Sequence, residues 1–457
     1  MVRNIKKITY NNLIHVFFVC NYDFKGILKL TMNIKKIKGT KDFFQEEMLH
    51  LQFIEQNLKK IIEKYHFREI RTPILEYRDI FYHATPQSEM VKKETYQFLD
   101  KKGRNIVLRP EGTAGIVRSY LENKLYNFDN IYKFYYCGPF FRYERPQYGR
   151  YRQFHQIGIE MLGNYHDLSE LEILCLVKEI LDFFNLPQAQ IKINHLGNAQ
   201  TRQKFIKIFS DYLQNFSSDL CSLCLKRKKF NILRIFDCKI CQKKIFLKQA
   251  PLILNFLDSS LKHKFEIFLS LLKKENINFF IDPTLVRGLD YYTDIVFEIA
   301  LPIPNKEPFE LILGGGGNYN DLICHFGSKK MIKAIGFAIG IERLMIALQY
   351  NNFWKNINFK LLDVCVLSVD YSVNYEAFIL IQKLRQNNIN AEIIYNTDDG
   401  INLTKCIKQA LKLKPNYLIF IGAKELKDSF LTVKNTTTKI IYNVNLNNII
   451  TFLKRRS

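Results

Sequence analysis

Residues 138–160 read GPFFRYERPQYGRYRQFHQIGIE. Aromatic and β-branched residues at both ends predict two strands, and Pro146 and Gly149 predict the turn between them. The region between the strands is rich in arginine and contains Arg142, Arg145, Arg150 and Arg152. Because a guanidinium group matches phosphate oxygens bidentately, this hairpin predicts a clamp for a triphosphate or for an RNA backbone.

The returning strand of the hairpin carries a second polar set. Gln156, Gly158 and Glu160 alternate along it, and side chains two residues apart in a strand point to the same face. Gly158 leaves room between the two polar groups. A surface hairpin has little reason to place these residues inward among aromatic side chains, so we interpret this face as the wall of a binding site.

The stretch LRPEGTAG, residues 108–115, adds a carboxylate and a hydroxyl. If Glu111 and Thr113 lie on extended backbone, both point to one side, where they would suit an ammonium group. A plain surface turn is the alternative interpretation.

Charged residues also interrupt the apolar, strand-like segment LVRGLDYYT, residues 285–293. Buried charges need partners, so Arg287 and Asp290 either pair with each other or face a ligand.

Two glycine-containing segments follow. The run GGGGNYN, residues 314–320, allows backbone to approach a ligand closely, but it lacks the lysine that completes a Walker loop. In AIGFAIGIERL, residues 334–344, Arg343 begins a helix behind two glycines. It serves either as a buried cap or as a nucleotide-phosphate contact.

The composition limits the class of protein. The chain has 457 residues, with 67 Lys and Arg against 44 Asp and Glu, a formal charge of +23. This excess favours a polyanionic partner, nucleic acid before an acidic membrane surface, although an AT-biased genome also enriches lysine. The 47% hydrophobic fraction is typical of a globular protein and excludes collagen-like, coiled-coil and wholly disordered classes. No apolar run reaches the ~18 residues of a membrane span, and single cysteines in apolar surroundings indicate a reduced, cytoplasmic protein.

Periodicity predicts how the chain is organised. Residues 1–31 are basic around a short apolar stretch, which fits a targeting segment or an upstream-extended reading frame, and we exclude them from the fold. The elements expected next are a helix over 42–65, a strand over 68–77 that Pro73 confines to an edge, and a helix over 168–184.

The second half divides by composition. Residues 196–282 carry 16 Lys and Arg against 7 Asp and Glu and have helical periods, which predicts an inserted helical subdomain. From residue 361 onward, apolar runs alternate with helical stretches, as in a compact α/β domain with a largely parallel sheet. The expected domains are an extension (1–31), a core in two parts (32–195 and 283–352), the insertion (196–282) and a C-terminal domain (361–457).

Four cysteines inside the expected insertion form two C-x-x-C pairs, namely Cys221, Cys224, Cys238 and Cys241. Two such pairs at this spacing are a strong sequence signal for a four-thiolate zinc site. The hypothesis is a structural Zn²⁺ that rigidifies the insertion, and the alternative is four reduced thiols without metal.

In this order, the segments resemble histidyl-tRNA synthetase, a class II aminoacyl-tRNA synthetase. Motif 1 of that class resembles residues 42–77, motif 2 the arginine hairpin, and motif 3 residues 340–343. The letters RPEGTAG and RGLDYY are close to diagnostic of the histidine enzyme. The resemblance implies an α+β fold: an antiparallel-sheet catalytic core with a helical insertion, followed by an α/β anticodon-binding domain. It also implies that ATP with bound Mg²⁺ activates L-histidine for transfer to tRNA(His), in a homodimer without membrane attachment.

The resemblance also implies residue roles. Arg142, which holds the α-phosphate and the histidine carboxylate, and Arg287, a fixed cation where related enzymes use a metal, are the expected catalytic residues. Glu160 accepts the imidazole N–H, while Tyr292 or a bridging water supplies the complementary contact. The expected histidine-binding residues are Glu111, Gly112, Thr113, Arg142, Gln156, Glu160, Arg287, Tyr291 and Tyr292. The expected ATP-binding residues are Arg142, Arg150 and Arg343, and the expected tRNA-binding residues are Arg145 and Gln147.

One departure and two rival functions complete the expectations. The family usually has arginine where this chain has Asn318, which leaves the role of the glycine run open. A regulatory subunit of ATP phosphoribosyltransferase shares the core but typically lacks the anticodon domain and has eroded motifs. A basic RNA-binding sensor is the other rival. Histidine-dependent exchange of pyrophosphate into ATP separates the enzyme from both.

Overall fold

The computed structural model describes residues 34–86, 88–128, 130–303, 310–328, 330–357, 359, 362–396 and 403–456, together with the backbone of 19–22 and 28–31. The chain forms two compact units that divide between Phe353 and Trp354.

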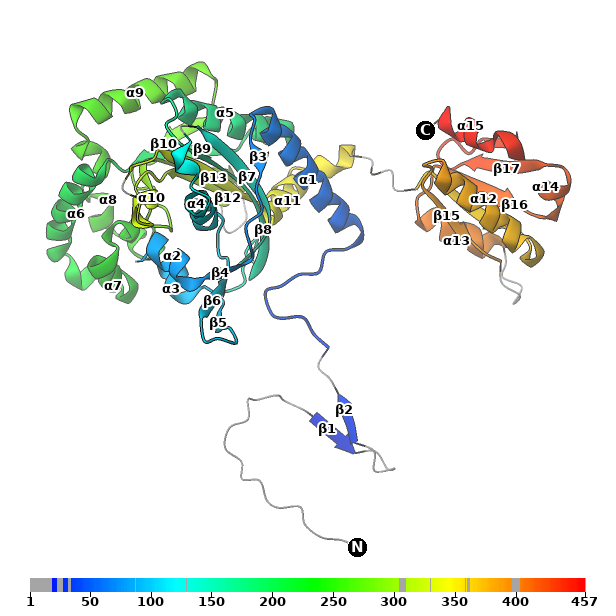
Figure 1. The fold of residues 1–457 in the computed structure, drawn as a ribbon, viewed down its shortest axis with the longest axis horizontal. Helices are drawn as coiled ribbons and strands as arrows, with labels where there is room; N and C mark the ends of the chain where they lie inside the picture. The colour runs from blue at the N-terminus through cyan, green and yellow to red at the C-terminus, as the bar shows by residue number, and fades with distance from the viewer. Residues whose placement is uncertain are drawn as a thin grey trace, which may run out of the picture. The chain divides into compact units, whose positions relative to one another are not determined.

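The first unit is built on an eight-stranded sheet in the order β10-β9-β11-β12-β13-β8-β7-β3 (Figure 1). Every internal pairing is antiparallel, whereas β10 and β3 run parallel to their neighbours at the two edges. In chain order the strands are β3 Arg68–Glu69, β7 Tyr132–Phe141, β8 Gln153–Leu162, β9 Gln190–His195, β10 Phe279–Ile281, β11 Thr293–Pro302, β12 Glu310–Asn318 and β13 Ala334–Gly340. The predicted antiparallel core is confirmed.

A layer of helices packs on this sheet. Helix α11 (Ile341–Tyr350) contacts β8, β12 and β13, and α1 (Gln45–Lys64) contacts both α11 and α5 (Leu168–Phe183). Helix α1 forms because apolar residues recur along it at helical spacing. Its buried members are Leu51, Ile54, Leu58, Ile61 and Ile62.

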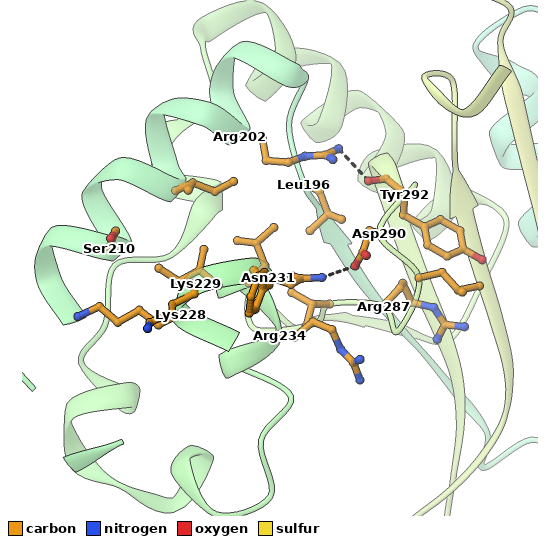
Figure 2. A pocket seen from close by; sticks show the side chains of 16 residues that line it. Leu196, Arg202, Ser210, Lys228, Lys229, Asn231, Arg234, Arg287, Asp290 and Tyr292 are labelled. Atoms are coloured by element: carbon orange, nitrogen blue, oxygen red, sulfur yellow. Dashed lines mark hydrogen bonds between the residues drawn. The ribbon is translucent and has the colours of Figure 1, made fainter. Parts of the chain in front are cut away.

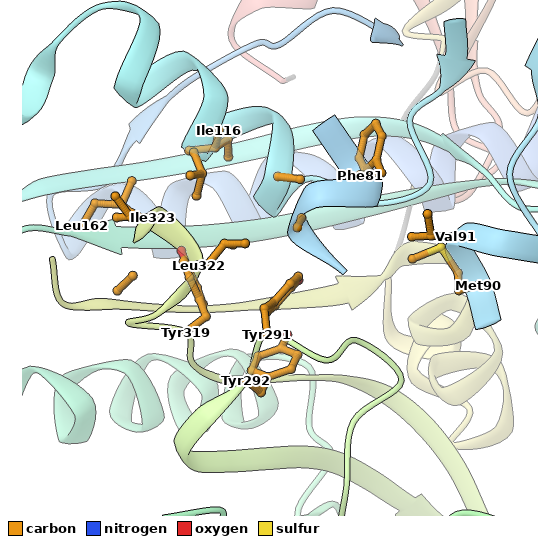
Figure 3. Packing of buried hydrophobic residues seen from close by; sticks show 14 of the residues in the cluster. Phe81, Met90, Val91, Ile116, Leu162, Tyr291, Tyr292, Tyr319, Leu322 and Ile323 are labelled. Carbon is orange, nitrogen blue, oxygen red and sulfur yellow. The ribbon is translucent and has the colours of Figure 1, made fainter. Parts of the chain in front are cut away.

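A separate apolar cluster lies on the face of the sheet that Leu162 shares with Glu160, two positions earlier on β8 (Figure 3). It joins α2 (Arg78–Ala84), α3 (Glu89–Lys93) and α4 (Thr113–Glu122) to the chain around Tyr291 and Tyr319. Helix α10 (Leu322–His325) adds Leu322 and Ile323 to the same cluster. Beside these helices lies a small sheet in the order β4-β6-β5, with strands Leu75–Tyr77, Asn105–Leu108 and Gln97–Leu99.

Two strand predictions in this unit are wrong. Residues 68–77 split into β3 and β4, which belong to different sheets, with Pro73 between them. Proline cannot donate to a ladder, so it ends one pairing before the next begins. Residues 284–292 form a loop, and strand β11 begins only at Thr293.

The four glycines 314–317 lie inside strand β12 instead of forming a loop. A Cβ atom at Gly316 would come within 2.0 Å of the Gly336 carbonyl oxygen on β13. The sheet is therefore too closely packed here for any larger residue.

The insertion is helical as predicted. Its helices are α6 Ala199–Gln214, α7 Ser222–Phe230, α8 Ile245–Lys248 and α9 Ser259–Lys274, with short 3₁₀ turns that include η3 Ile232–Ile235 and η4 Cys241–Lys243. Asn198 caps α6 and Asp258 caps α9, because each side chain accepts a backbone N–H of the first turn. The chain then returns to the main sheet at β10.

The second unit is a five-stranded sheet in the order β15-β14-β16-β17-β18. Its strands are β14 Val364–Ser368, β15 Ala391–Ile394, β16 Tyr417–Ile421, β17 Phe430–Asn435 and β18 Ile441–Asn445, and its helices are α12 Asn374–Gln386, α13 Leu403–Lys412, α14 Ala423–Lys427 and α15 Ile449–Lys454. The sheet is mixed, not largely parallel, because β17 and β18 add an antiparallel hairpin to one edge. The prediction missed this hairpin.

Within the N-terminal extension, β1 (Val19–Tyr22) pairs antiparallel with β2 (Leu28–Thr31). The rest of segment 1–31 lies outside the described residues. Among the helices that the structure describes, none combines the length and the apolar character needed to cross a membrane.

Candidate active site

A cavity of about 860 Å³ lies on the Glu160 face of the main sheet. Most of the site residues expected from the sequence line it, and these are Glu111, Thr113, Arg142, Gln147, Arg150, Gln156, Glu160, Arg287, Tyr291, Tyr292 and Arg343. Two others are not in the lining. Gly112 packs against the ring of Tyr136, where a Cβ would come within 2.4 Å of Cζ, and Arg145 is exposed on the hairpin loop.

Glu160 lies on the wall of this cavity and is 1% exposed. The Thr113 hydroxyl donates to its Oε1 at 2.7 Å, and the Tyr319 hydroxyl donates to its Oε2 at 2.5 Å. Burial raises the pKa of Glu160 to about 8, although both hydroxyl donors act to lower it. A Cβ at Gly336 would lie 1.9 Å from Oε2, so the neighbouring strand must present glycine here.

Glu111 lies two residues before α4 and Thr113 is the first residue of that helix, so the two do not share the extended backbone that was considered for them. The Glu111 carboxylate accepts the backbone N–H of Thr113 at 2.6 Å and that of Ala114 at 3.0 Å, which caps the helix. Burial raises its pKa, while these N–H groups and the charge of Arg142 oppose the rise. Two buried carboxylates thus share one end of the cavity.

Three guanidinium groups gather near the hairpin. Arg142 donates from Nε to the Pro110 carbonyl oxygen at 2.8 Å, and Arg343 donates to the Gly149 and Ile312 carbonyl oxygens at 3.1 and 2.9 Å. Burial, together with the positive charges of Arg150 and Arg142, lowers the pKa of Arg343 to about 10. Such mutual repulsion between cations is relieved by a polyanion, so this region favours phosphate groups.

Arg287 lies in the 285–292 loop and forms an ion pair with Glu298 of β11. Arg287 does not pair with Asp290, the alternative considered from the sequence. Asp290 accepts a hydrogen bond from Asn231 of the insertion. Arg287 Nε is buried without a hydrogen-bond partner among the described residues. Gly315 makes room for this side chain, since a Cβ there would come within 2.7 Å of Nη1.

An interaction between distant segments fixes the hairpin against α11. The Glu342 carboxylate accepts the backbone N–H of His155 at 2.9 and 3.0 Å and lies 2.8 Å from its ring Nδ1. The carboxylate raises the pKa of His155 against the opposing effect of burial. This contact holds the strand of Gln156 and Glu160 beside the helix of Arg343.

Sequence reasoning missed Tyr319, Glu298 and the His155–Glu342 pair. Tyr319 comes two residues after the four glycines. Its closeness to these glycines, which allow a ligand to approach the backbone, was the available signal that it belongs to the site. Asn318 itself is buried away from the cavity lining and donates to Glu170 Oε1 at 2.8 Å.

A family model described as histidyl-tRNA synthetase matches residues 39–211 and 243–344, and a model described as an anticodon binding domain matches residues 363–456. The histidine–tRNA ligase of Phytoplasma mali is 45% identical over 426 residues, which cover 93% of this chain and 99% of that protein. The chain belongs to the histidyl-tRNA synthetase family. The histidine–tRNA ligase of Acholeplasma laidlawii is 38% identical over 425 residues, with the same shares covered.

Solved structures agree with this membership. The apo histidyl-tRNA synthetase of S. aureus has a TM-score of 0.77 and 33% identity, and the match covers 92% of this chain and 100% of that one. A Bacillus halodurans structure, titled as an ATP phosphoribosyltransferase regulatory subunit or histidyl-tRNA synthetase, has a TM-score of 0.61 at 19% identity and shares the fold. The class II fold predicted from the motifs is therefore confirmed.

Proposed function

We propose that this chain is a histidine–tRNA ligase. A carboxylate oxygen of histidine attacks the α-phosphorus of ATP, which forms histidyl-adenylate and releases pyrophosphate. A hydroxyl of the terminal ribose of tRNA(His) then attacks the acyl carbon, and AMP leaves. The observation that carries this proposal is the single cavity in which guanidinium groups and two buried carboxylates face a common space.

The first step needs alignment and charge stabilisation rather than a protein nucleophile, because the histidine carboxylate attacks. We assign Arg142 to the α-phosphate and the histidine carboxylate, Arg343 to the triphosphate and Arg150 to the outer phosphates. Arg287 acts as a fixed cation across from Arg142. Mg²⁺ bound with ATP would supply charge neutralisation at the phosphates, and Glu144, which lines the cavity, would offer it a carboxylate ligand.

Histidine recognition follows from hydrogen-bond inventory. We assign the α-ammonium group to Glu111 and Thr113, beside Gly112, and the imidazole N–H to Glu160. A neutral imidazole also has one acceptor nitrogen, which Tyr292 or a bridging water satisfies. The further residues assigned to the pocket are Gln156 and Tyr291. A site built around such pairs rejects apolar amino acids by ~10⁴-fold or more without editing, because they leave its groups unpaired.

The decisive experiment is exchange of labelled pyrophosphate into ATP with each of the twenty amino acids. We expect exchange with histidine alone. Absence of histidine-dependent exchange in folded protein would exclude the ligase and favour a regulatory subunit or an RNA-binding sensor. Exchange with another amino acid would refute the assignment of Glu160.

We further propose that tRNA(His) contacts both units. Arg145 and Gln147 are exposed on the hairpin loop and are assigned to the acceptor end, and residues 363–456 are assigned to the anticodon. Arg145→Ala should therefore lower kcat/KM for tRNA aminoacylation more than the rate of pyrophosphate exchange. Equal losses in both assays would argue against a tRNA contact.

We propose a cytoplasmic homodimer. The described cysteines are all free, as expected of a reduced compartment. The small sheet exposes apolar side chains of the kind that a second copy of the chain would cover: Leu75, Tyr77 and Phe98 share one face of it, with exposed fractions of 46–54%. Light scattering should give the mass of two chains, and Phe98→Glu should give one. A monomeric native protein would contradict this.

A further inference from the structure

The four cysteines of the insertion converge on one point. Their Sγ atoms all lie within 4.8 Å of one another, and the sulfurs of Cys221 and Cys238 are 3.6 Å apart. A tetrahedral Zn²⁺ with bonds of about 2.3 Å places its sulfur ligands about 3.8 Å apart. A disulfide requires about 2.05 Å, so the arrangement matches a metal site and not a covalent bridge.

Backbone donors surround these sulfurs. The N–H of Cys224 donates to Cys221 Sγ, that of Cys241 to Cys238 Sγ, and that of Cys221 to Cys241 Sγ, each at 3.5 Å. Hydrogen bonds of this kind stabilise metal-bound thiolates and orient them. Cys224 and Cys241 have no exposed surface, and an apolar cluster that includes Phe209 encloses them. This is a closed, four-ligand geometry, which is typical of structural rather than catalytic zinc.

The segment between the two cysteine pairs contacts the catalytic unit. Arg227 donates to Glu89 of α3 at 2.8 Å and to the Arg234 carbonyl oxygen at 2.7 Å, and Arg234 pairs with the same Glu89 at 3.3 Å. Asn231 donates to Asp290, and both residues line a cavity of about 360 Å³ (Figure 2). Asp290 lies three residues after Arg287, so α7 and η3 abut the loop that presents this guanidinium group.

We propose that Cys221, Cys224, Cys238 and Cys241 bind one Zn²⁺ ion, and that this ion holds α7 and η3 against the Arg287 loop. The stretch 212–242, which holds all four cysteines, lies between the two ranges that the family model matches. Fixing both ends of the segment limits the positions of Asn231 and Arg227. These are positioning residues, and they act on the site through Asp290 and Glu89.

The first test measures metal in the native protein, purified under reducing conditions. Elemental analysis should find about one zinc per chain, and replacement by Co²⁺ should give the visible absorption bands of tetrahedral cobalt thiolate. Iron in place of zinc would overturn the identity of the ion. Protein that is folded but contains neither metal, or that contains disulfides between these cysteines, would overturn the site.

Matched variants locate the ligands. Cys224→Ser and Cys238→Ser should lose most of the bound zinc, whereas Cys406→Ser, which alters a buried cysteine of the second unit, should retain it. Zinc retained in both insertion variants would overturn the ligand set. Should the insertion variants fail to fold, mercurial titration of the native protein should release one zinc as four thiols react, and release without thiol reaction would count against the site.

Hydrogen exchange tests the coupling to the loop. Removal of zinc should accelerate amide exchange in residues 285–292 and 88–94, and Asn231→Ala should accelerate it in 285–292 with zinc retained. Unchanged exchange in these segments after metal removal would overturn the positioning role. The contact between the zinc site and the loop does not depend on the proposed function; only its effect on catalysis rests on that proposal. If the protein contains zinc but shows no histidine-dependent exchange of pyrophosphate into ATP, the ligase proposal alone fails. If the enzyme is active but contains no zinc, the metal site alone fails.

Discussion

The hydrogen bond between Tyr319 and Glu160 leads to a quantitative prediction. The Tyr319 hydroxyl donates to Glu160 Oε2 at 2.5 Å and is one of two hydroxyl groups that favour the ionised carboxylate. Tyr319→Phe removes this donor and keeps the buried ring. A hydrogen bond to a charged group contributes about 1.5–3 kcal/mol, and about 1.4 kcal/mol corresponds to one pH unit. The ionisation midpoint of Glu160, about 8 in the native protein, should therefore rise by about one to two pH units.

The sign of the effect on histidine binding follows directly. If the ionised carboxylate binds the imidazole N–H, KM for histidine falls as pH rises toward the pKa of Glu160 and levels off above it. At about pH 7.5, a rise of one to two pH units from a pKa of about 8 lowers the ionised fraction by about 8- to 80-fold. We expect KM for histidine in Tyr319→Phe to increase by about that factor, with a smaller change in kcat.

The assay is pyrophosphate exchange at varied histidine concentration over a series of pH values. Tyr135→Phe is the matched control, because Tyr135 is equally buried and donates to Glu63 at 2.6 Å outside the cavity lining. Its KM profile should follow that of the native protein. If Tyr319→Phe folds normally and its KM profile does not move, the reasoning about Glu160 is refuted.

Three further substitutions test the site. Arg287→Ala should lower the exchange rate by about 10²–10³-fold with a smaller change in the Kd of ATP, because it removes a fixed charge from the reacting groups; near-native turnover would refute that role. Glu160→Gln should raise KM for histidine and remove its dependence on pH near 8, which a native profile would contradict. Gly336→Ala should raise the same KM, because its Cβ would come within 1.9 Å of Glu160 Oε2, and an unchanged KM would indicate that the strand shifts freely.

The parts of the site predictable from sequence were those set by local geometry. Gln156 and Glu160 share a face because they lie on one strand, and the turn residues Pro146 and Gly149 made the arginine hairpin recognisable. Helix α1 was predictable because its apolar residues repeat at 3.6 positions. The class of enzyme followed from the order of several such segments, and the comparisons confirmed it.

Contacts between distant segments could not be predicted in the same way. Arg287 and Asp290 are three residues apart, yet Arg287 pairs with Glu298 and Asp290 with Asn231. The loop at 285–292 has the composition of a strand, but tertiary contacts decide its conformation. The sequence also overestimated the share of parallel pairing in the second unit. The β17–β18 hairpin joins the edge of the sheet at β16 in antiparallel pairing, and this contact between segments leaves no local pattern.

The glycine strand has a consequence for redesigning this protein. Gly314 and Gly315 line the cavity, and side chains at these positions would collide with the Ala338 carbonyl oxygen and with Arg287. The cavity wall at Gly314 and Gly315 consists of main chain, so mutagenesis can change the size of the cavity only at other lining residues. A library meant to admit bulkier or non-standard substrates should therefore vary side chains that line the cavity elsewhere, such as Tyr291, and keep Gly314 and Gly315.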